Sequence, residues 1–317
     1  MSSRRGWTMS AAAALLTLAI TAGLPTLGAK AAGALPYPDV ADTTHATPGA
    51  AAQFRAFFVP KSAHQPKALM DRFARQGVLY IDATSGGVWP SWDSLNGIFS
   101  GFLPKAPPAA LSYPVRILGD ERSALVAFTD TPQLFGRELR ILGAVSFGKD
   151  GRVIRWMDYW DGRSSGAKNT IGPKYPTDFH DNVGNATGRI AEVSGRLQRA
   201  FAAGDAAGAA ALFSPDAVYE DMALHGQVLG RLAIQRYLAR GLARAPYGPG
   251  AALAHVVGSD LGGGYEWRAG PSFPMKRGNT ALALDRDGLI TRLTVVYDSS
   301  LLADADYRAV AQLALEP

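Results

Sequence analysis

The chain has 317 residues, of which 47% are hydrophobic and 19% charged. This composition is typical of a packed globular protein, and the length suggests two domains. Cysteine is absent, which excludes disulfides, thiolate metal sites and cysteine nucleophiles.

The N-terminal segment has the three parts of a secretory signal peptide. Arg4 and Arg5 precede an apolar stretch at 10–27. Small-x-small sequences follow, which predict cleavage after Ala31 or Ala34. An uncleaved membrane anchor is the alternative.

We therefore expect residues 1–34 to be removed and the protein to be exported, either to the periplasm or out of the cell. The sequence from Ser3 to Trp7 also resembles the start of a twin-arginine signal. Removing the three cations of this segment lowers the formal net charge from +5 to +2. No nucleic-acid partner is expected, and no membrane span after cleavage.

The rest of the chain predicts the same order of elements twice. In each copy a helix and a strand are followed by a loop and a second helix, and in the first copy four strands complete the order. In chain order we expect an extended arm at 35–48, helix 51–73, strand 77–82, helix 92–102, strands 115–118, 124–129, 137–147 and 153–160, a linker at 164–186, helix 187–213, strand 217–221 and helix 231–242. Helices followed by antiparallel strands predict the α+β class, with the helices on one face of a curved sheet.

The two copies also align in sequence. Tyr80–Gly87 matches Tyr219–Gly226 without a gap, and blocks on either side match at offsets between 137 and 140 residues. Near-constant offsets favour a tandem duplication over chance similarity. We expect a first domain at 49–163 and a second at 187–313.

The second copy carries a recognisable motif. Leu212 to Asp221, followed by Gly230 to Tyr237, resembles the signature of the SnoaL-like polyketide cyclases and ketosteroid isomerases, within the nuclear transport factor two-like superfamily. The first copy resembles it more distantly. The resemblance implies two tandem cone-shaped domains, each a curved, mostly antiparallel sheet packed against N-terminal helices around an apolar pocket. This fold hosts isomerases, cyclases, dehydratases, epoxide hydrolases and non-catalytic binders.

The resemblance also implies candidate acids. Asp221 and Asp82 occupy the position of the isomerase base, at the end of the first strand. Asp158 matches the aspartate that the cyclases use in the final strand, where the second copy has Val295. We therefore predict Asp158 and Asp82 as a catalytic acid–base pair in the first domain.

The isomerases also use a tyrosine and a protonated aspartic acid as oxyanion donors. Leu197 and Thr280 occupy these positions in the second copy, and Phe57 that of the tyrosine in the first. Steroid isomerase activity of the usual kind is not expected.

Aromatic and polar residues near these acids are the expected pocket. They are Tyr80, Trp89, Glu138, Arg140, Trp156, Trp160, Tyr219, Asp221, His225 and Tyr297. The set formed by Glu138, Arg140 and Asp158 resembles the acid–arginine–acid site of limonene epoxide hydrolase-like proteins. Alternatives remain open: an ion pair between Asp158 and Arg140, an exposed Glu138–Arg140 pair, tryptophans that only fill the core, and a solvent-exposed His225.

The sequence thus predicts an exported small-molecule protein without a cofactor. The five histidines have no metal-ligand spacing, and no metal site is expected. One hypothesis is proton-transfer chemistry (isomerisation, cyclisation or dehydration) on a small apolar or polyketide-like compound. The alternative is non-catalytic binding of a small apolar ligand. A third hypothesis is that the two domains are a purely structural pair in which neither pocket works. The two domains are expected to form an intramolecular pseudo-dimer through their sheets.

Overall fold

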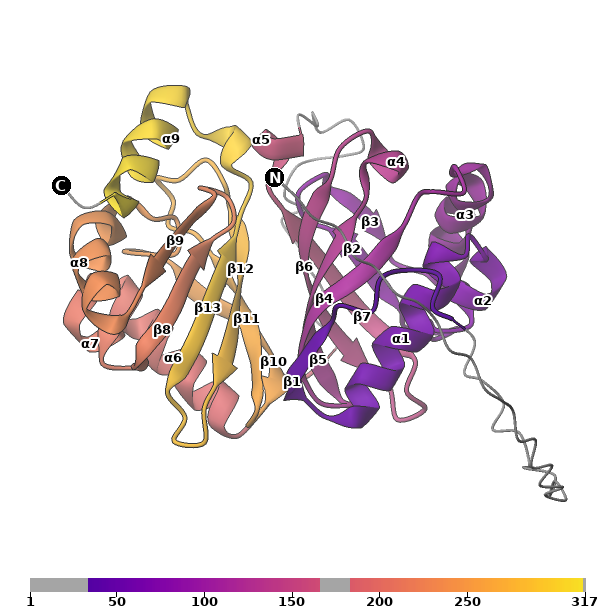
Figure 1. Ribbon diagram of the computed structural model, residues 1–317, viewed down its shortest axis with the longest axis horizontal. Coiled ribbons are helices and arrows are strands. Elements are labelled where there is room, and N and C mark those ends of the chain that lie inside the picture. The colour runs from indigo at the N-terminus through magenta and orange to yellow at the C-terminus, as the bar shows by residue number, and fades with distance from the viewer. Residues whose placement is uncertain (1–33, 166–182, 316–317) are drawn as a thin grey trace, which may run out of the picture. The chain divides into compact units, whose positions relative to one another are not determined.

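The computed structural model describes residues 34–165 and 183–315. The predicted signal peptide, apart from Ala34, and most of the predicted linker lie outside these residues. Two separate curved sheets, of seven and six strands, contain all the named strands of the described chain. Each is covered by helices on one face, as the predicted α+β class requires (Figure 1).

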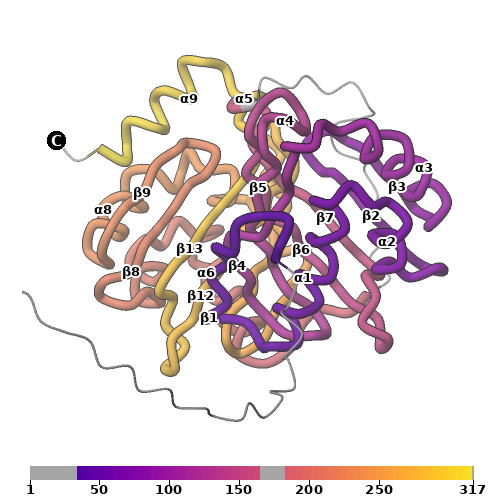
Figure 2. Tube along the Cα trace, turned by 45° about the vertical axis from the view of Figure 1, so that its right-hand side comes forward, coloured from indigo at the N-terminus to yellow at the C-terminus, as the bar shows by residue number. Residues whose placement is uncertain are grey.

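The first sheet has the strand order β1-β4-β5-β6-β7-β2-β3. Its strands are β1 (Asp42–Ala46), β2 (Leu79–Asp82), β3 (Gly87–Trp89), β4 (Ser112–Gly119), β5 (Ser123–Asp130), β6 (Leu139–Phe147) and β7 (Val153–Trp160). Neighbours are antiparallel except in the pairs β1–β4 and β2–β7. β1 lies beside β4 at the sheet edge (Figure 2), so the predicted arm at 35–48 includes a strand of the sheet.

Helices α1 (Pro48–Ser62), α2 (Pro66–Met70) and α3 (Trp92–Phe102) cover one face of this sheet (Figure 1). Their apolar side chains form one cluster with the residues of that face, and much of the cluster is aromatic. Two short helices follow β5 and β7, namely α4 (Pro132–Phe135) and α5 (Gly162–Ser165). The interior of the first half is therefore filled largely by aromatic rings.

The second sheet has the order β10-β11-β12-β13-β8-β9. Its strands are β8 (Phe213–Asp221), β9 (Gly226–Leu229), β10 (Ala252–Ser259), β11 (Gly262–Arg268), β12 (Arg277–Leu284) and β13 (Ile290–Val296). Helices α6 (Arg189–Ala202), α7 (Ala206–Ala210) and α8 (Arg231–Gly241) cover one face, and α9 (Asp304–Ala311) follows the last strand. β13 pairs in parallel with β8, as β7 does with β2. Among these described helices none is both long and apolar enough to cross a membrane.

The two long helices predicted at 51–73 and 187–213 are wrong in one respect, because each is broken into two. His64 has a φ of 55°, and Pro66 starts α2. Gly204 has a φ of 69°, and the side chain of Asp205 caps α7 by accepting the Gly208 N–H at 2.8 Å. A left-handed residue ends a helix, and a proline or a cap then starts the next one.

The faces of the sheets that the helices leave uncovered pack against each other. Their shared apolar cluster includes Leu125 and Met157 from the first half and Val257 and Ala281 from the second. Gly264 permits this close approach, since a Cβ there would lie 2.6 Å from the Leu125 side chain. This is the sheet contact that the predicted pseudo-dimer requires.

An ion pair is buried within this contact. Arg155 Nη1 lies 2.5 Å from Glu266 Oε1, and the Tyr159 hydroxyl donates to Glu266 Oε2 at 2.9 Å. Both charged side chains are at most 2% exposed. Burial alone would raise the pKa of Glu266, but the charge and hydrogen bond of Arg155 outweigh it and the pKa is lowered. Glu266 is therefore a buried carboxylate.

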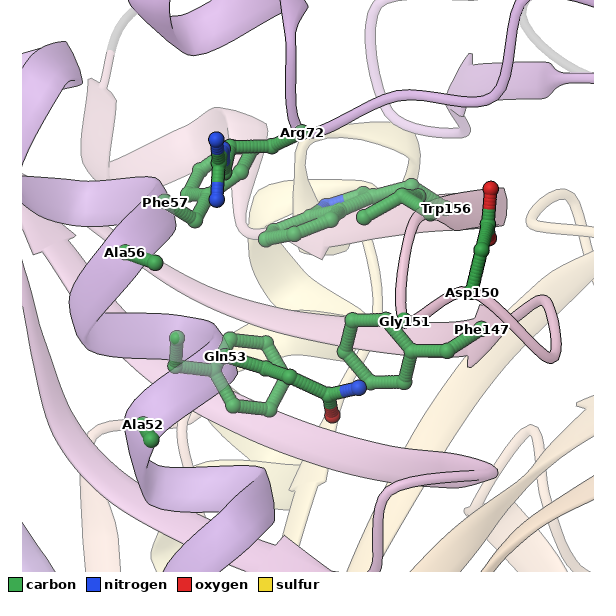
Figure 3. Close-up of a pocket in the computed structure, with 11 residues that line it drawn as sticks. Ala52, Gln53, Ala56, Phe57, Arg72, Phe147, Asp150, Gly151 and Trp156 are labelled. Atoms are coloured by element: carbon green, nitrogen blue, oxygen red, sulfur yellow. The ribbon is translucent and has the colours of Figure 1, made fainter.

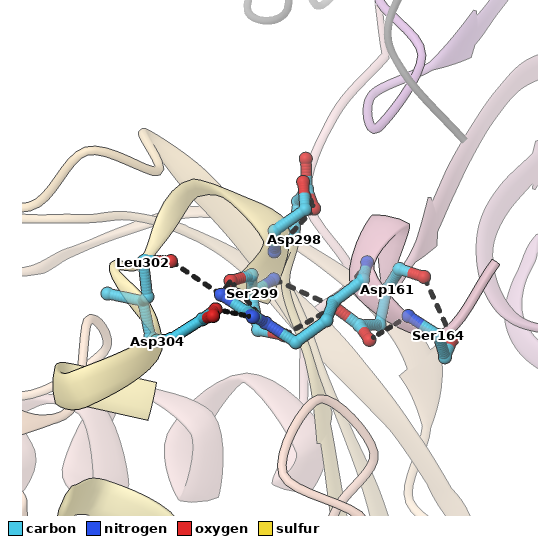
Figure 4. A network of polar contacts seen from close by, with 8 residues as sticks. Asp161, Ser164, Asp298, Ser299, Leu302 and Asp304 are labelled. Atoms are coloured by element: carbon cyan, nitrogen blue, oxygen red, sulfur yellow. Dashed lines mark hydrogen bonds and ion pairs between the residues drawn. The ribbon is translucent and has the colours of Figure 1, made fainter. Parts of the chain in front are cut away.

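A reciprocal pair of hydrogen bonds joins the ends of the last strands (Figure 4). Asp161 accepts the N–H and hydroxyl of Ser299 at 2.8 and 2.7 Å, and Asp298 accepts the N–H of Gly162 at 3.1 Å. Arg163 adds an ion pair with Asp304 at 2.5 Å. Asp161 and Asp298 lie just after β7 and β13, and their hydrogen bonds connect the two halves.

Candidate functional site

Two predicted acids lie next to each other in the first sheet. Asp82, the last residue of β2, is directly opposite Asp158 of β7 in the strand register. Asp158 is only 5% exposed, whereas Asp82 is partly exposed. The Tyr80 hydroxyl donates to Asp158 Oδ2, and the Trp156 indole N–H donates to Asp158 Oδ1 at 2.5 Å. Trp160 donates to Asp82 at 2.9 Å.

Burial raises the pKa of Asp158 to about 7, and the negative charge of Asp82 adds to the rise. Hydrogen bonds from Tyr80 and Trp156 and the charge of Lys61 oppose it. Burial also raises the pKa of Asp82, against hydrogen bonds from Ser85 and Trp160. Near neutral pH, Asp158 can therefore both hold and release a proton.

The tryptophans of this half are core residues as well as hydrogen-bond donors. Trp156 stacks on Phe57 with ring centroids 4.4 Å apart, and Tyr80 lies nearly parallel to it at 6.1 Å. Trp89 meets Tyr80 edge-on at 5.7 Å. Among the cavities described below, none is lined by Asp158 or Asp82.

The ion pair considered between Asp158 and Arg140 is wrong. Arg140 Nε lies 3.0 Å from Glu138 Oε1, and the Arg140 side chain is 71% exposed. Ile141, the next residue along β6, belongs to the aromatic interior, so Arg140 points to the opposite face of the sheet from Asp158. The suggested arrangement of Glu138, Arg140 and Asp158 around one water does not form.

The second half has a different acid centre. Asp221 ends β8 opposite Val295, which confirms that Asp158 has no counterpart there. Asp221 Oδ1 accepts the N–H groups of Ala223 and Leu224, each at 3.0 Å. The hydroxyls of Tyr297 and Tyr247 donate to Oδ2 at 3.4 and 3.5 Å.

Burial raises the pKa of Asp221 to about 7, while the hydrogen bonds from Leu224 and Ala223 lower it and the charge of Asp161 raises it further. Tyr219 joins this centre through a hydrogen bond between its hydroxyl and that of Tyr247. Tyr247 was not among the predicted residues. It lies in a loop rich in proline and glycine, where no periodicity indicates which way a side chain points.

A cavity of about 370 Å³ lies at the junction of the two halves. It brings together four predicted pocket residues that the sequence had placed in two separate cones: Glu138, Arg140, Asp221 and His225. The other lining residues are Asp161, Ser164, Glu220, Met222, Gly226 and Gln227. His225 is exposed, as the alternative interpretation held, and it lies at the rim.

This cavity is polar, in contrast to the apolar pocket that was expected. Glu138 is paired with Arg140, and Glu220 with Arg292 at 3.1 Å. Asp221 also lines the cavity although it is only 3% exposed, and burial raises the pKa of its carboxyl to about 7. Within the described residues no group of three or more histidine, aspartate or glutamate side chains is placed to hold a metal ion.

No protein-family model matches the chain, and no curated protein matches it significantly. Solved structures do. A SnoaL-like protein of unknown function from Burkholderia thailandensis is 16% identical, with a TM-score of 0.31, over 36% of this chain and 96% of its own. A steroid delta-isomerase from Pseudomonas aeruginosa is 16% identical, with a TM-score of 0.29, over 38% and 90%.

A third structure, of an uncharacterized protein with a cystatin-like fold from Silicibacter pomeroyi, is 17% identical, with a TM-score of 0.33, over 38% of this chain and 82% of its own. Identities this low concern the fold and not the reaction. The solved structures that are similar to parts of this chain thus include a SnoaL-like protein and a steroid delta-isomerase.

Proposed function

We propose that the chain binds a small polar molecule in the cavity between its halves and moves a proton to or from it through Asp221. One observation carries this proposal: a buried carboxyl with a pKa of about 7 lines a cavity of about 370 Å³. Perturbed carboxyls in cavities of this size are typical of acid–base sites. Export of the protein, predicted from residues 1–34, is part of the proposal, and the intact mass of the mature protein tests it.

The surroundings of Asp221 suit this role. Two backbone N–H groups hold Oδ1, so the carboxyl is fixed in orientation. The hydroxyls of Tyr297 and Tyr247 stabilise the charged form at Oδ2, and burial stabilises the neutral form. Because the two forms are close in free energy at neutral pH, Asp221 can take a proton from a ligand and return it to another atom.

The test is α-hydrogen exchange of small cyclic ketones in D₂O, followed by proton NMR. We predict that Asp221→Asn slows the exchange of any accepted ketone by about 10²–10⁴-fold, the usual contribution of general acid–base catalysis. Glu220→Gln is the matched control, since Glu220 lines the same cavity but is paired with Arg292. Equal exchange by wild type and a folded Asp221→Asn variant would rule out the proposal.

A second candidate is the Asp158 centre, which the sequence predicted as catalytic with Asp82. It is favoured by the Tyr80–Asp158 hydrogen bond and by a pKa of about 7 for Asp158. The same assay separates the candidates, because exchange lost in Asp158→Asn but kept in Asp221→Asn assigns the chemistry to the first half. Binding without exchange in either variant or in wild type favours the non-catalytic alternative.

A further inference from the structure

A groove of about 420 Å³ lies in the second half between α9 and the turn that joins β8 to β9 (Figure 1). The turn contributes residues 224–227 to its lining. The helical segment on the other side contributes Arg308, Ala311, Gln312, Ala314 and Leu315. All of these residues except Leu224 are exposed or half-buried, so their side chains are open to a ligand in solution.

The helical wall of the groove is anchored to the rest of the second half. Arg240 Nη2 of α8 donates to the Leu313 carbonyl at 3.0 Å. Ala314 packs against the start of β9, since a Cβ at Gly226 would lie 3.7 Å from the Ala314 Cβ. The groove therefore exists before any ligand binds.

One end of the groove carries a positive charge that no carboxylate pairs with. Arg308 is exposed and forms no ion pair with a described residue. The nearest acid along α9, Asp304, is held by Arg163 at 2.5 Å. The hydrogen bond and charge of Arg163 lower the pKa of Asp304, and the charge of Arg308 adds to this effect. One carboxylate thus serves two guanidinium groups, and Arg308 remains available to an anion.

His225 faces the same groove from a backbone conformation that suits glycine better. Its φ is 54°, in the left-handed region. In the internal alignment it corresponds to Gly86 of the first half, which has a φ of 77°. Glycine adopts this conformation without strain, whereas a side chain there is disfavoured. The strain at His225 therefore favours a use for its exposed imidazole.

Beyond Arg308 the helical wall is largely apolar. Ala311 and Ala314 are half-buried, and Leu315, at 71% exposed, is the most exposed large apolar side chain of the described residues. The helical rise from Arg308 to Leu315 adds up to about 10–12 Å. A ligand with an anionic head and an apolar chain of this length would cover Leu315 as well as neutralise Arg308.

We propose that this groove binds an aliphatic carboxylic acid, with its carboxylate between Arg308 and His225 and its chain along Ala311, Ala314 and Leu315. A guanidinium can form two parallel hydrogen bonds with a carboxylate, and an imidazole N–H can donate another. The described lining contains no acidic residue, so the carboxylate meets no like charge there. The site is separate from the one proposed at Asp221, although residues 225–227 line both cavities.

The test uses octanoate as probe and ligand-observed NMR titration of the full-length chain. A ligand this small is expected to bind with a millimolar dissociation constant. Neutral octanamide should bind roughly tenfold more weakly, since it loses the charge of the pair. Butyrate should also bind at least about tenfold more weakly, because its chain is four methylenes shorter.

Arg308→Gln should weaken octanoate about tenfold and leave octanamide unchanged. Leu315→Ser should weaken octanoate several-fold and leave butyrate unchanged, because butyrate is too short to reach residue 315. Both replaced side chains are exposed, so the fold should survive, and thermal melts verify this. Undetectable binding of octanoate at millimolar concentration, or equal binding by wild type and Arg308→Gln, would overturn the proposal.

Arg72→Gln is the matched control. Arg72 is also an exposed arginine, but it lines a different cavity, of about 290 Å³, beside α1 (Figure 3). The rings of Phe57 and Trp156 at that cavity are at most 3% exposed, so they offer an acyl chain little surface. Arg72→Gln should therefore bind octanoate as wild type does, and a tenfold loss in this variant would overturn the assignment to Arg308.

His225→Gly separates a binding role of His225 from a role in the turn. Because glycine relieves the strain, the melting temperature should rise by about 1–3 °C, while octanoate should bind several-fold more weakly. A rise in melting temperature with unchanged octanoate binding would mean that the imidazole does not contact the carboxylate.

The same probe distinguishes this proposal from the proposed function. Asp221→Asn should bind octanoate as tightly as wild type, and Arg308→Gln should exchange ketone hydrogens at the wild-type rate. Loss of octanoate binding in Asp221→Asn would show that the probe occupies the cavity between the halves, and it would overturn the assignment to the groove.

Discussion

Asp158 is a carboxyl that the folded protein prefers to keep protonated. Its pKa of about 7 lies above the ordinary value of 3.8, so between these pH values the folded chain binds a proton that the unfolded chain releases. Its contribution to stability is therefore present at low pH and is lost as the pH rises through 7. We predict that the free energy of unfolding of Asp158→Asn, measured relative to that of wild type, rises by roughly 4 kcal/mol between pH 4 and pH 8.

Denaturant titrations of both proteins across this pH range measure the difference. Asp150→Asn is the matched control, because Asp150 is exposed and hydrogen bonds from Arg152 lower its pKa. The free energy of unfolding of Asp150→Asn should differ little from that of wild type, and relative to wild type it should fall slightly as the pH rises. If the free energies of unfolding of wild type and Asp158→Asn differ by the same amount at every pH in this range, Asp158 is charged throughout and holds no proton.

At the scale of elements, local signals decide which predictions hold. α3 and β7 begin and end at the predicted residues: Ser91 and Ser94 form a capping box for α3, and seven of the eight residues of β7 are buried. The helix breaks were missed although Pro66 and Gly204 are visible in the sequence, because apolar spacing continues across both. Periodicity alone does not reveal a short break.

The candidate site was predictable only in part. Asp82 was placed by aligning the two copies and Asp158 by the resemblance to the cyclases, and the strand register puts the two residues opposite each other. The cavity at Asp221 could not be predicted, because it exists only where the packed sheets meet, and no local pattern encodes that packing. For the same reason Glu138 and Arg140 were assigned to the wrong neighbours.

β6 carries a glycine where the acid centre needs space. Gly143 lies opposite Asp158, and a Cβ there would come within 3.1 Å of Trp156 Nε1 and 3.2 Å of Asp158 Oδ1. We predict that Gly143→Ala destabilises the protein by about 1–3 kcal/mol through overpacking. Gly97→Ala is the control, since no atom crowds that exposed position of α3, and it should stabilise by about 0.5–1 kcal/mol. If Gly143→Ala also stabilises in urea titrations, the centre is not tightly packed.

At the scale of the whole molecule, the contact between the two sheets joins the halves. The reciprocal bonds of Asp161 and Asp298 repeat the same connection from both sides, as expected for two copies facing each other. Such contacts make each half part of the other's core, so we expect the halves to unfold together. The duplication itself stays a prediction, supported by the repeated element order and the parallel pairing of β2–β7 and β8–β13.

The buried pair Arg155–Glu266 is the most sensitive point of this contact. Replacing Glu266 by glutamine leaves the Arg155 charge buried without its carboxylate, and we predict a loss of about 3–5 kcal/mol. Glu138→Gln breaks the exposed pair with Arg140 and should cost at most about 1 kcal/mol. The double variant Arg155→Met with Glu266→Leu should recover most of the loss, because it removes both charges and keeps the volume. Urea titrations give the three values. A cost for Glu266→Gln as small as that for Glu138→Gln would mean that water reaches the pair and that the sheets are not closely packed there.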